Sequence, residues 1–256
     1  MKTKKLISHI IQSALILAVA GLGTSGTASA DGFFMPPTVI PRDAVVFGKT
    51  YADWAAAWWQ WALSIPVATH PLFDNGDCSV EQSGPVFFLG GKFCSTPTNS
   101  TNPPPCTAGT ATRSCTVSSK KALFFPIVNT EDSTVEEAIY NPPPNPPKTI
   151  AELRSVTAGQ INQVSLIEAE VDGHSIRNLK TDFRVQSPVF EFTVPDDNLL
   201  KAISEDIGLG TYSPAVDDGV YLMLSSLRPG SHVIHFKAAV GTQVIVDITY
   251  NLNVVK

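Results

Sequence analysis

The 256-residue sequence lacks the short motifs that mark the common enzyme classes. Residues 31–256 contain no G-x-S-x-G nucleophile elbow, no H-E-x-x-H zinc motif and no phosphate-binding P-loop. A catalytic site assembled from distant residues would leave no such motif, so these absences lower the expectation of an enzyme without excluding one. Lys and Arg are scattered rather than clustered. This argues against nucleic acid or an anionic membrane as a partner.

Long apolar runs are also scarce. One lies within residues 1–30, where Lys2, Lys4 and Lys5 precede an apolar stretch that ends in small residues at Ala30. This order is typical of a cleavable signal peptide, and the stretch is shorter than the roughly 20 residues of a membrane span. We therefore expect cleavage near Ala30, export to a periplasm or to the extracellular space, and a mature chain without a transmembrane segment. Cleavage removes three of the 18 basic side chains and none of the 23 acidic ones, which leaves an acidic protein.

The sequence has only four cysteines, Cys78, Cys94, Cys106 and Cys115. No two have the C-x-x-C spacing of a metal centre, and an even number in an exported chain indicates disulfides. Three pairings are possible. We prefer the nested pairing, Cys78–Cys115 outside Cys94–Cys106, because Cys94 and Cys106 bracket a loop rich in Ser, Thr and Pro.

A strongly apolar helix is predicted over residues 51–65. Thr50 and Asp53 form a capping-box pattern at its start, and Pro66 ends it. At about 100° per residue, one stripe of the helix is aromatic or aliphatic and contains Tyr51, Trp54, Trp58, Trp61 and Ile65. Such a stripe is typical of a helix that faces the core. Trp59 lies off the stripe, so we expect it to be the most accessible tryptophan and the candidate to stack on a ligand such as a sugar ring.

Most of the remaining chain has the alternating pattern of β-strands. Residues 244–254 alternate apolar and polar side chains, which is typical of an antiparallel sheet with one solvated face. Other strands are predicted at 85–89, 121–128, 165–171, 190–194, 220–224 and 232–237, with a type II turn at 228–231 and helices opening at 149 and spanning 199–206. We expect a mainly β single domain over 31–256. Its fold would be an antiparallel β-sandwich, jelly-roll or immunoglobulin-like, with the Trp-rich helix packed on it.

Three strings carry a family resemblance: WWQWALSIP at 58–66, QSGPVFFL at 82–89 and PGSHVIHF at 229–236. They resemble a family of exported bacterial proteins of unknown function, and the resemblance spans nearly all of residues 31–256. It implies export and one domain, and it brings no activity or functional residue. Relatives are shorter between Cys94 and Cys106, which implies an inserted loop and leaves Cys78–Cys115 as the basic bridge.

Histidines and paired acids are the remaining candidates for catalytic or metal-binding residues. His232 and His235 are three apart on a predicted strand, so they point to opposite faces and cannot chelate one ion. Glu168 and Glu170 share a face about 7 Å apart, within the range of an inverting glycosidase pair, although solvent-facing strands often carry such pairs. His174 follows a turn and is expected to be exposed.

Two acidic pairs loosely resemble calcium-loop chemistry, Asp196–Asp197 with Asn198, and Asp217–Asp218. Turn and cap roles explain both adequately, so no cofactor or metal is predicted beyond this structural calcium alternative. The leading hypothesis is a non-catalytic exported module that binds an envelope or extracellular partner, such as a polysaccharide. The alternatives are an extracellular hydrolase that uses Glu168 and Glu170, and a structural envelope protein.

Overall fold

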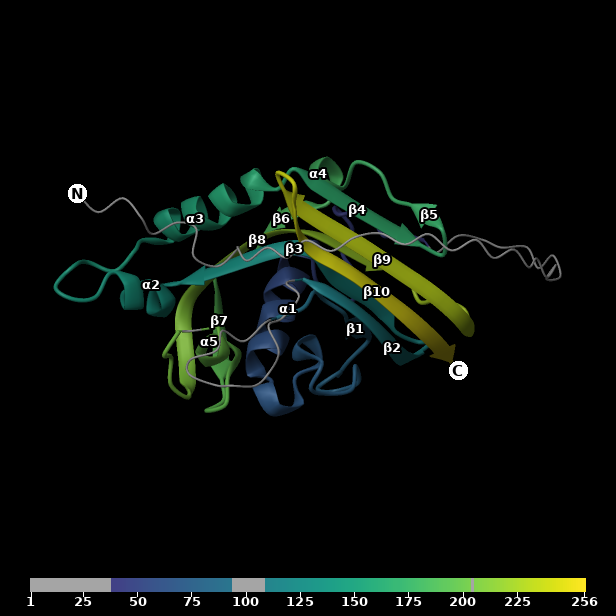
Figure 1. Ribbon diagram of the computed structural model, residues 1–256, viewed down its shortest axis with the longest axis horizontal. Coiled ribbons are helices and arrows are strands. Elements are labelled where there is room, and N and C mark those ends of the chain that lie inside the picture. The colour runs from purple at the N-terminus through teal and green to yellow at the C-terminus, as the bar shows by residue number, and fades with distance from the viewer. Residues whose placement is uncertain (1–37, 94–108, 204) are drawn as a thin grey trace, which may run out of the picture. The chain divides into compact units, whose positions relative to one another are not determined.

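A computed structural model describes residues 38–93, 109–203 and 205–256 of the chain. The protein is mainly β, with two five-stranded sheets and a Trp-rich helix (Figure 1). The predicted signal peptide at 1–30 and the predicted Cys94–Cys106 bridge lie outside the described residues.

The first sheet has the strand order β1-β3-β8-β6, and β7 also pairs with β8. Its strands are β1 (Val86–Phe88), β3 (Ala122–Ser133), β6 (Arg184–Gln186), β7 (Phe190–Val194) and β8 (Gly210–Leu224). The long antiparallel pair of β3 and β8 forms its centre, and β1 lies parallel to β3.

The second sheet has the order β2-β10-β9-β4-β5. Its strands are β2 (Thr110–Ser118), β4 (Leu166–Val171), β5 (His174–Ser175), β9 (Gly230–Val240) and β10 (Gln243–Val255). The pair of β2 and β10 is parallel over its whole length. Both sheets are therefore mixed, and the expectation of purely antiparallel sheets is wrong. Parallel pairing joins segments that are distant in the chain, so no short turn sequence between the strands predicts it.

Apolar side chains from both sheets meet in one core, including Phe125 and Leu222 of the first sheet and Phe236 and Tyr250 of the second. The opposite face of the first sheet is covered by helix α1 (Tyr51–Ser64), with Phe124, Tyr221 and Met223 pointing toward it. The first sheet is thus buried on both faces. This explains why residues 215–224 of β8 are a continuous run of buried residues rather than an alternating one.

The remaining helices are short apart from α3. They are η1 (Val67–Thr69), η2 (Pro71–Phe73), α2 (Thr134–Tyr140), α3 (Ile150–Gln163), α4 (Leu179–Asp182) and α5 (Leu199–Ala202). Capping boxes form at the two predicted helix starts, Thr50 with Asp53 and Thr149 with Glu152, and each fixes the start of its helix. α3 packs on the ends of β3 and β8.

Two further predictions concern the buried face of β10 and the turn before β9. The buried positions of β10 are Ile248, Tyr250, Leu252 and Val254, as the alternation predicts. The predicted type II turn at 228–231 is wrong. Gly230 has a φ of 141°, already opens β9, and does not adopt the φ near +80° that this turn requires.

Candidate functional site

All four tryptophans of α1 are buried. Trp58 is 1% exposed, and Trp54, Trp59 and Trp61 are each 7% exposed. The expectation that Trp59 is the most accessible is therefore wrong. Trp59 lies outside the predicted stripe, on a second buried side of α1. There its indole N–H donates to Asp217 Oδ1 of β8 at 2.7 Å.

A pocket of about 400 Å³ opens beside α1, and we call it the Trp pocket. Its buried side is aromatic, because Phe88 of β1 lies against Trp54 and Trp61, with ring centroids 6.1 and 5.5 Å away. Its exposed lining is mainly polar and comprises Lys49, Gln60, Ser64, Glu81 and Ser83, together with Gly84 and Pro85. The volume lies in the lower part of the range of small-ligand sites.

The indole N–H groups in the Trp pocket are already used by the protein. Trp54 donates to the Val46 carbonyl at 3.0 Å, and Trp61 donates to the Val80 carbonyl at 3.3 Å. The parts of these rings that reach the pocket, 7% of each tryptophan and part of Phe88, therefore offer a ligand apolar surface rather than hydrogen bonds. The ammonium of Lys49 lies 5.0 Å from the Trp54 ring centroid, which adds a cation at the edge of the aromatic surface.

The segment 78–85 forms one wall of the Trp pocket and is held rigidly. The Gln82 amide donates to the Phe88 carbonyl and accepts from the Phe88 N–H, both at 2.8 Å, so a side chain completes a pairing that β1 lacks on this edge. The Cys78–Cys115 disulfide ties the start of the segment to β2. This bridge confirms the prediction for these two cysteines, and it makes the wall a preorganised part of the site.

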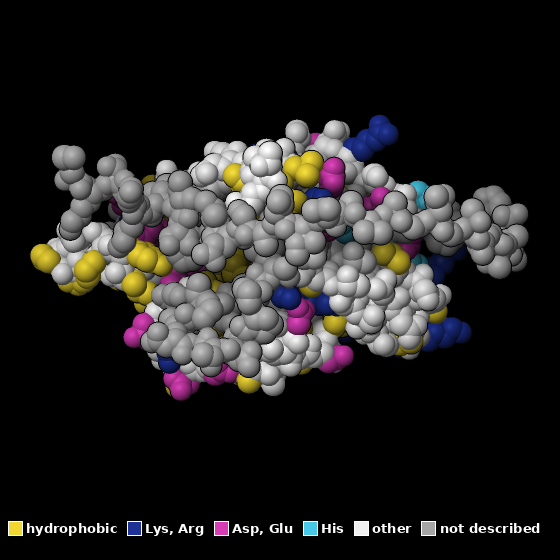
Figure 2. Space-filling model, viewed as in Figure 1, with side chains coloured by type: hydrophobic (Ala, Val, Ile, Leu, Met, Phe, Trp, Pro, Cys, Tyr) yellow, Lys and Arg dark blue, Asp and Glu magenta, His cyan; other side chains and the backbone are white. Residues whose placement is uncertain are grey.

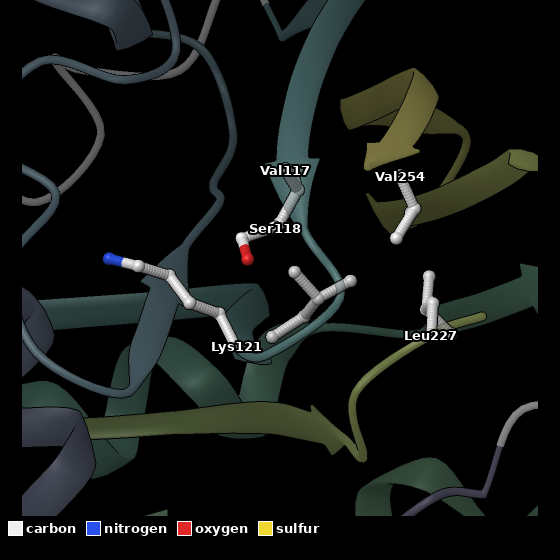
Figure 3. Close-up of a pocket in the computed structure, with 6 residues that line it drawn as sticks. Val117, Ser118, Lys121, Leu227 and Val254 are labelled. Atoms are coloured by element: carbon white, nitrogen blue, oxygen red, sulfur yellow. The ribbon is translucent and has the colours of Figure 1, made fainter. Parts of the chain in front are cut away.

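A second hollow lies between the ends of β2, β3 and β10 and is too narrow to admit water (Figure 3). It is lined mainly by Val117, Leu227 and Val254, and Ser118 and Lys121 stand at its edge. Ser and Lys three apart also occur in Ser-Lys hydrolases. Here the Lys121 side chain extends away from Ser118 (Figure 3), and its ammonium donates to the Gln82 carbonyl at 3.1 Å. The hollow is therefore a packing feature.

Behind Trp59 lies a group of buried acids that we call the carboxyl cluster: Glu131, Asp132, Glu136 and Asp217. Burial raises the pKa of Glu131 and Glu136 well above the usual range, raises the pKa of Asp132 to about 7 and raises the pKa of Asp217 to about 8. Sequence reasoning missed the first three. The one available signal was Ser133 followed three residues later by Glu136, which is an N-cap pattern and opens α2.

The buried Arg113 of β2 connects the second sheet to the segments around η2 and the end of β1. Its guanidinium donates to Asp74 Oδ1 and Tyr250 Oη, both at 2.7 Å, and to the carbonyls of Gly90 and Gly91 at 3.1 and 2.9 Å. His70 lies nearby and is fully buried. Its Nδ1 accepts from the Leu72 N–H, so Nε2 carries the proton that it donates to the Ala62 carbonyl in α1. These bonds fix the C-terminal end of α1.

The histidines singled out from the sequence have separate partners. His232 Nδ1 lies 2.7 Å from Asp172 Oδ2, and His235 Nε2 lies 2.8 Å from Asp247 Oδ1. Each imidazole thus has its own carboxylate, as expected for structural residues on opposite faces of a strand. His174 is exposed, and its Nδ1 lies 2.9 Å from the Asp172 carbonyl.

The paired acids of β4 face solvent. Glu168 is exposed and Glu170 is half-buried. They stand opposite Lys237 and His235 of β9 in the strand register. Lys237 and His235 make their side-chain contacts with Asp247, at 3.4 and 2.8 Å, so Glu168 and Glu170 are surface acids on a sheet face that also carries basic side chains.

The two acidic pairs considered for calcium have other roles. Asp217 and Asp218 lie within β8 rather than in a loop, and Asp218 is held by both nitrogens of the Arg184 fork at 2.8 and 2.9 Å. Asp197 accepts from the Ala68 N–H, and Asn198 caps α5. Within the described ranges, no group of three or more His, Cys, Asp or Glu side chains is arranged to hold a metal ion.

No family model matches this chain. No curated protein matches it either. Among solved structures, the crystal structure of a cysteine protease inhibitor from Entamoeba histolytica is similar to 66% of this chain over 96% of its own length, with 10% identity and a TM-score of 0.22. A likeness this weak carries no argument about fold or function.

A polyanionic partner selects a cluster of Lys and Arg on the surface, and a helical membrane span needs a long apolar helix. Lys and Arg side chains are dispersed rather than gathered on the face shown in Figure 2. None of the helices in the described part of the chain is long and apolar enough to cross a membrane.

Proposed function

We propose that this chain is an exported, non-catalytic binding module that takes a short carbohydrate segment in the Trp pocket. In this proposal residues 1–30 are a signal peptide, residues 31–256 are one domain, and the two sheets form a sandwich of the jelly-roll or immunoglobulin type. The protein would act in a bacterial periplasm or outside the cell, as the family resemblance implies. The observation that carries the proposal is the pocket of about 400 Å³ with aromatic depth and a polar exposed lining.

The chemistry of the Trp pocket matches a sugar better than a purely apolar ligand. A pyranose presents C–H groups on its ring faces and hydroxyl groups around its edge. Trp54, Trp61 and Phe88 supply apolar π surface for the former. The hydroxyl groups would meet donors and acceptors on Lys49, Gln60, Ser64, Glu81 and Ser83. Trp54 and Trp61 take the ligand-binding role that the sequence suggested for Trp59, because Trp59 faces the carboxyl cluster.

The experiment is a titration of the purified protein with a panel of soluble glycans and cell-wall fragments, followed by calorimetry and by tryptophan fluorescence. We expect one binding site per chain. Replacing Ser64, an exposed α1 residue of the pocket lining, by Arg should fill the pocket and abolish binding without disturbing the core. Gln60→Ala should weaken binding by about tenfold, because one polar contact is lost.

Gln163→Ala is the matched control, since Gln163 is an exposed helical glutamine on α3, away from the pocket lining. It should bind like the wild type. Failure of the whole panel to bind would overturn the carbohydrate proposal. Binding that Ser64→Arg leaves unchanged would remove the Trp pocket from it.

A further inference from the structure

We infer that the carboxyl cluster is a proton-dependent latch, in which shared protons hold helix α2 against strands β3 and β8 and their loss releases it. This inference concerns the fold rather than the ligand, and it is independent of carbohydrate binding in the Trp pocket.

The strand register brings the acids together. Glu131 of β3 stands directly opposite Asp217 of β8, and Glu131 also shares a hydrogen bond with Glu136 of α2. Two carboxyl groups can share a hydrogen bond only while one of them is protonated. Like charges directly opposite on neighbouring strands destabilise a sheet, so the register itself favours the protonated form.

Asp217 is the most deeply buried member of the cluster. It is 0% exposed, and its Oδ1 accepts from the Trp59 indole at 2.7 Å and from the Tyr221 hydroxyl at 2.8 Å. Its Oδ2 is buried and has no hydrogen-bond partner among the described residues, and the same holds for Glu131 Oε1. An ionised carboxylate with a bare buried oxygen is costly, whereas a protonated one is tolerated.

The surroundings supply little positive charge. The titratable and charged groups around the cluster come from every adjoining element: Asp132 of β3, Glu137 and Tyr140 of α2, Lys148 before α3, Arg154 of α3, Glu205 after α5, and Asp218 and Tyr221 of β8. Lys148 is paired with Glu137 at 2.6 Å. Arg154, which donates to the Ser187 carbonyl, is the one cation that acts on Asp217. Acids therefore outnumber cations around the cluster.

The direction of the pH effect follows from these contacts. Burial raises the pKa of Asp217 to about 8 and raises the pKa of Glu131 and Glu136 well above the usual range. In an unfolded chain the same groups release their protons near pH 4. The protons therefore stabilise the fold fully below about pH 4, and this stabilisation is lost as the pH rises towards 8.

Helix α2 is the element that this loss would release. It has only seven residues. Glu136 is its buried residue, and Ile139 and Tyr140 are 39% and 40% exposed. The Ser133 hydroxyl caps the helix and bonds the Glu136 carboxyl. Val135 is the α2 side chain that packs, partly buried, against the apolar cluster around α1. Glu136 is the buried contact of the helix, so ionisation of Glu136 acts directly on the attachment of α2.

Hydrogen exchange across a pH series tests the latch. After correction for intrinsic exchange, opening of residues 134–140 should increase at least about tenfold between pH 5 and pH 8, because one unit of pKa shift is a factor of ten. Segments of β9 and β10 should change far less. Glu136→Gln keeps a partner for Ser133 and should flatten the pH dependence, and Asp217→Asn should reduce it. Glu168→Gln, at an exposed strand glutamate, is the control and should behave like the wild type.

Carboxyl ¹³C titration of the wild-type protein gives a second readout that does not depend on any variant folding. Asp132 and Asp217 should titrate with midpoints near 7 and 8, and Glu131 and Glu136 should titrate above the usual range of a glutamate. The latch is refuted if every carboxyl titrates below about 5.5. It is also refuted if residues 134–140 open equally at both pH values, or if Glu136→Gln and Asp217→Asn keep the wild-type dependence.

Discussion

Replacing Arg113 by Met should be among the most destabilising single changes in this protein. The guanidinium is largely buried and makes a charge-assisted bond to Asp74 and three further short bonds, to Tyr250 and to the carbonyls of Gly90 and Gly91. Methionine fills a similar volume and makes none of them. Each lost bond costs about 1 kcal/mol, and more where the acceptor stays buried or charged, so we expect the free energy of unfolding to fall by about 3–5 kcal/mol.

That loss is large against the roughly 5–15 kcal/mol by which folded domains are stable. For a domain of this size it corresponds to a fall in Tm of about 6–20 °C. Urea unfolding followed by tryptophan fluorescence measures it directly, because all four tryptophans lie in α1. Arg113→Lys should lose less than Arg113→Met but still more than a surface change, since one ammonium cannot reach acceptors on several sides.

Arg177→Met is the matched control, because Arg177 is exposed. It should change the free energy of unfolding by less than about 0.5 kcal/mol. A change below about 1 kcal/mol in Arg113→Met would refute the reasoning. It would mean that the segments around η2 and the end of β1 are held in place without the Arg113 bonds.

Three further predictions concern pH, the disulfide and close packing. Burial lowers the pKa of His70 to about 4, so the neutral imidazole contributes about 3 kcal/mol to the free energy of unfolding above pH 6.5, and this contribution is lost as the pH falls towards 4. Comparing the urea midpoints of the wild type and His70→Asn over this pH range isolates the effect. Midpoints that change with pH in the same way in both proteins would contradict it. Replacing both Cys78 and Cys115 by Ser should lower the free energy of unfolding by about 3–4 kcal/mol, because the bridge closes a loop with a sequence separation of 37. Thermal unfolding measures this loss. An unchanged Tm would show that the loop is constrained without the bridge. Gly219→Ala should destabilise by about 1–3 kcal/mol, since a Cβ there would lie 2.6 Å from Asn129 Cβ; Gly91→Ala, where a Cβ has open space, is the control in the same denaturation assay, and equal stabilities would contradict the prediction.

Local patterns predicted the elements whose signals are contained in a short stretch of chain. The start and the end of α1 follow from Thr50, Asp53 and Pro66, and the buried face of β10 follows from strict alternation. The Cys78–Cys115 bridge was likewise predicted, as the outer bridge of the nested pairing.

The remainder depended on contacts between distant segments. Residues 210–219 of β8 were not predicted as a strand, because Asp217 and Asp218 suggest a turn. Each is tolerated there by a partner far along the chain, Trp59 for Asp217 and Arg184 for Asp218. The extension of β3 to Ser133 was missed for the same reason: charged residue types conceal the burial of Glu131 and Asp132.

The same long-range dependence concealed the surroundings of α1. Helical periodicity identified one buried stripe of α1 and left Trp59 outside it. The periodicity could not show that the Asp217 carboxyl group lies on the other side of the helix. Nor could it show that the segment 78–85 lies beside Trp54 and Trp61 and forms a pocket with them. The sequence identified the aromatic residues of α1, but it did not identify the groups that surround them.

The position of β10 in the second sheet constrains the order of events during folding. β10 separates β2 from β9, although both of those strands precede it in the chain. A nascent chain that has emerged only as far as β9 has no partner for β2, and Arg113 of β2 still lacks Tyr250. β9, β4 and β5 can pair without β10, but β2 joins the second sheet only after β10 is available. Chains interrupted before β10 should remain open and become targets for proteolysis instead of accumulating as truncated but folded molecules.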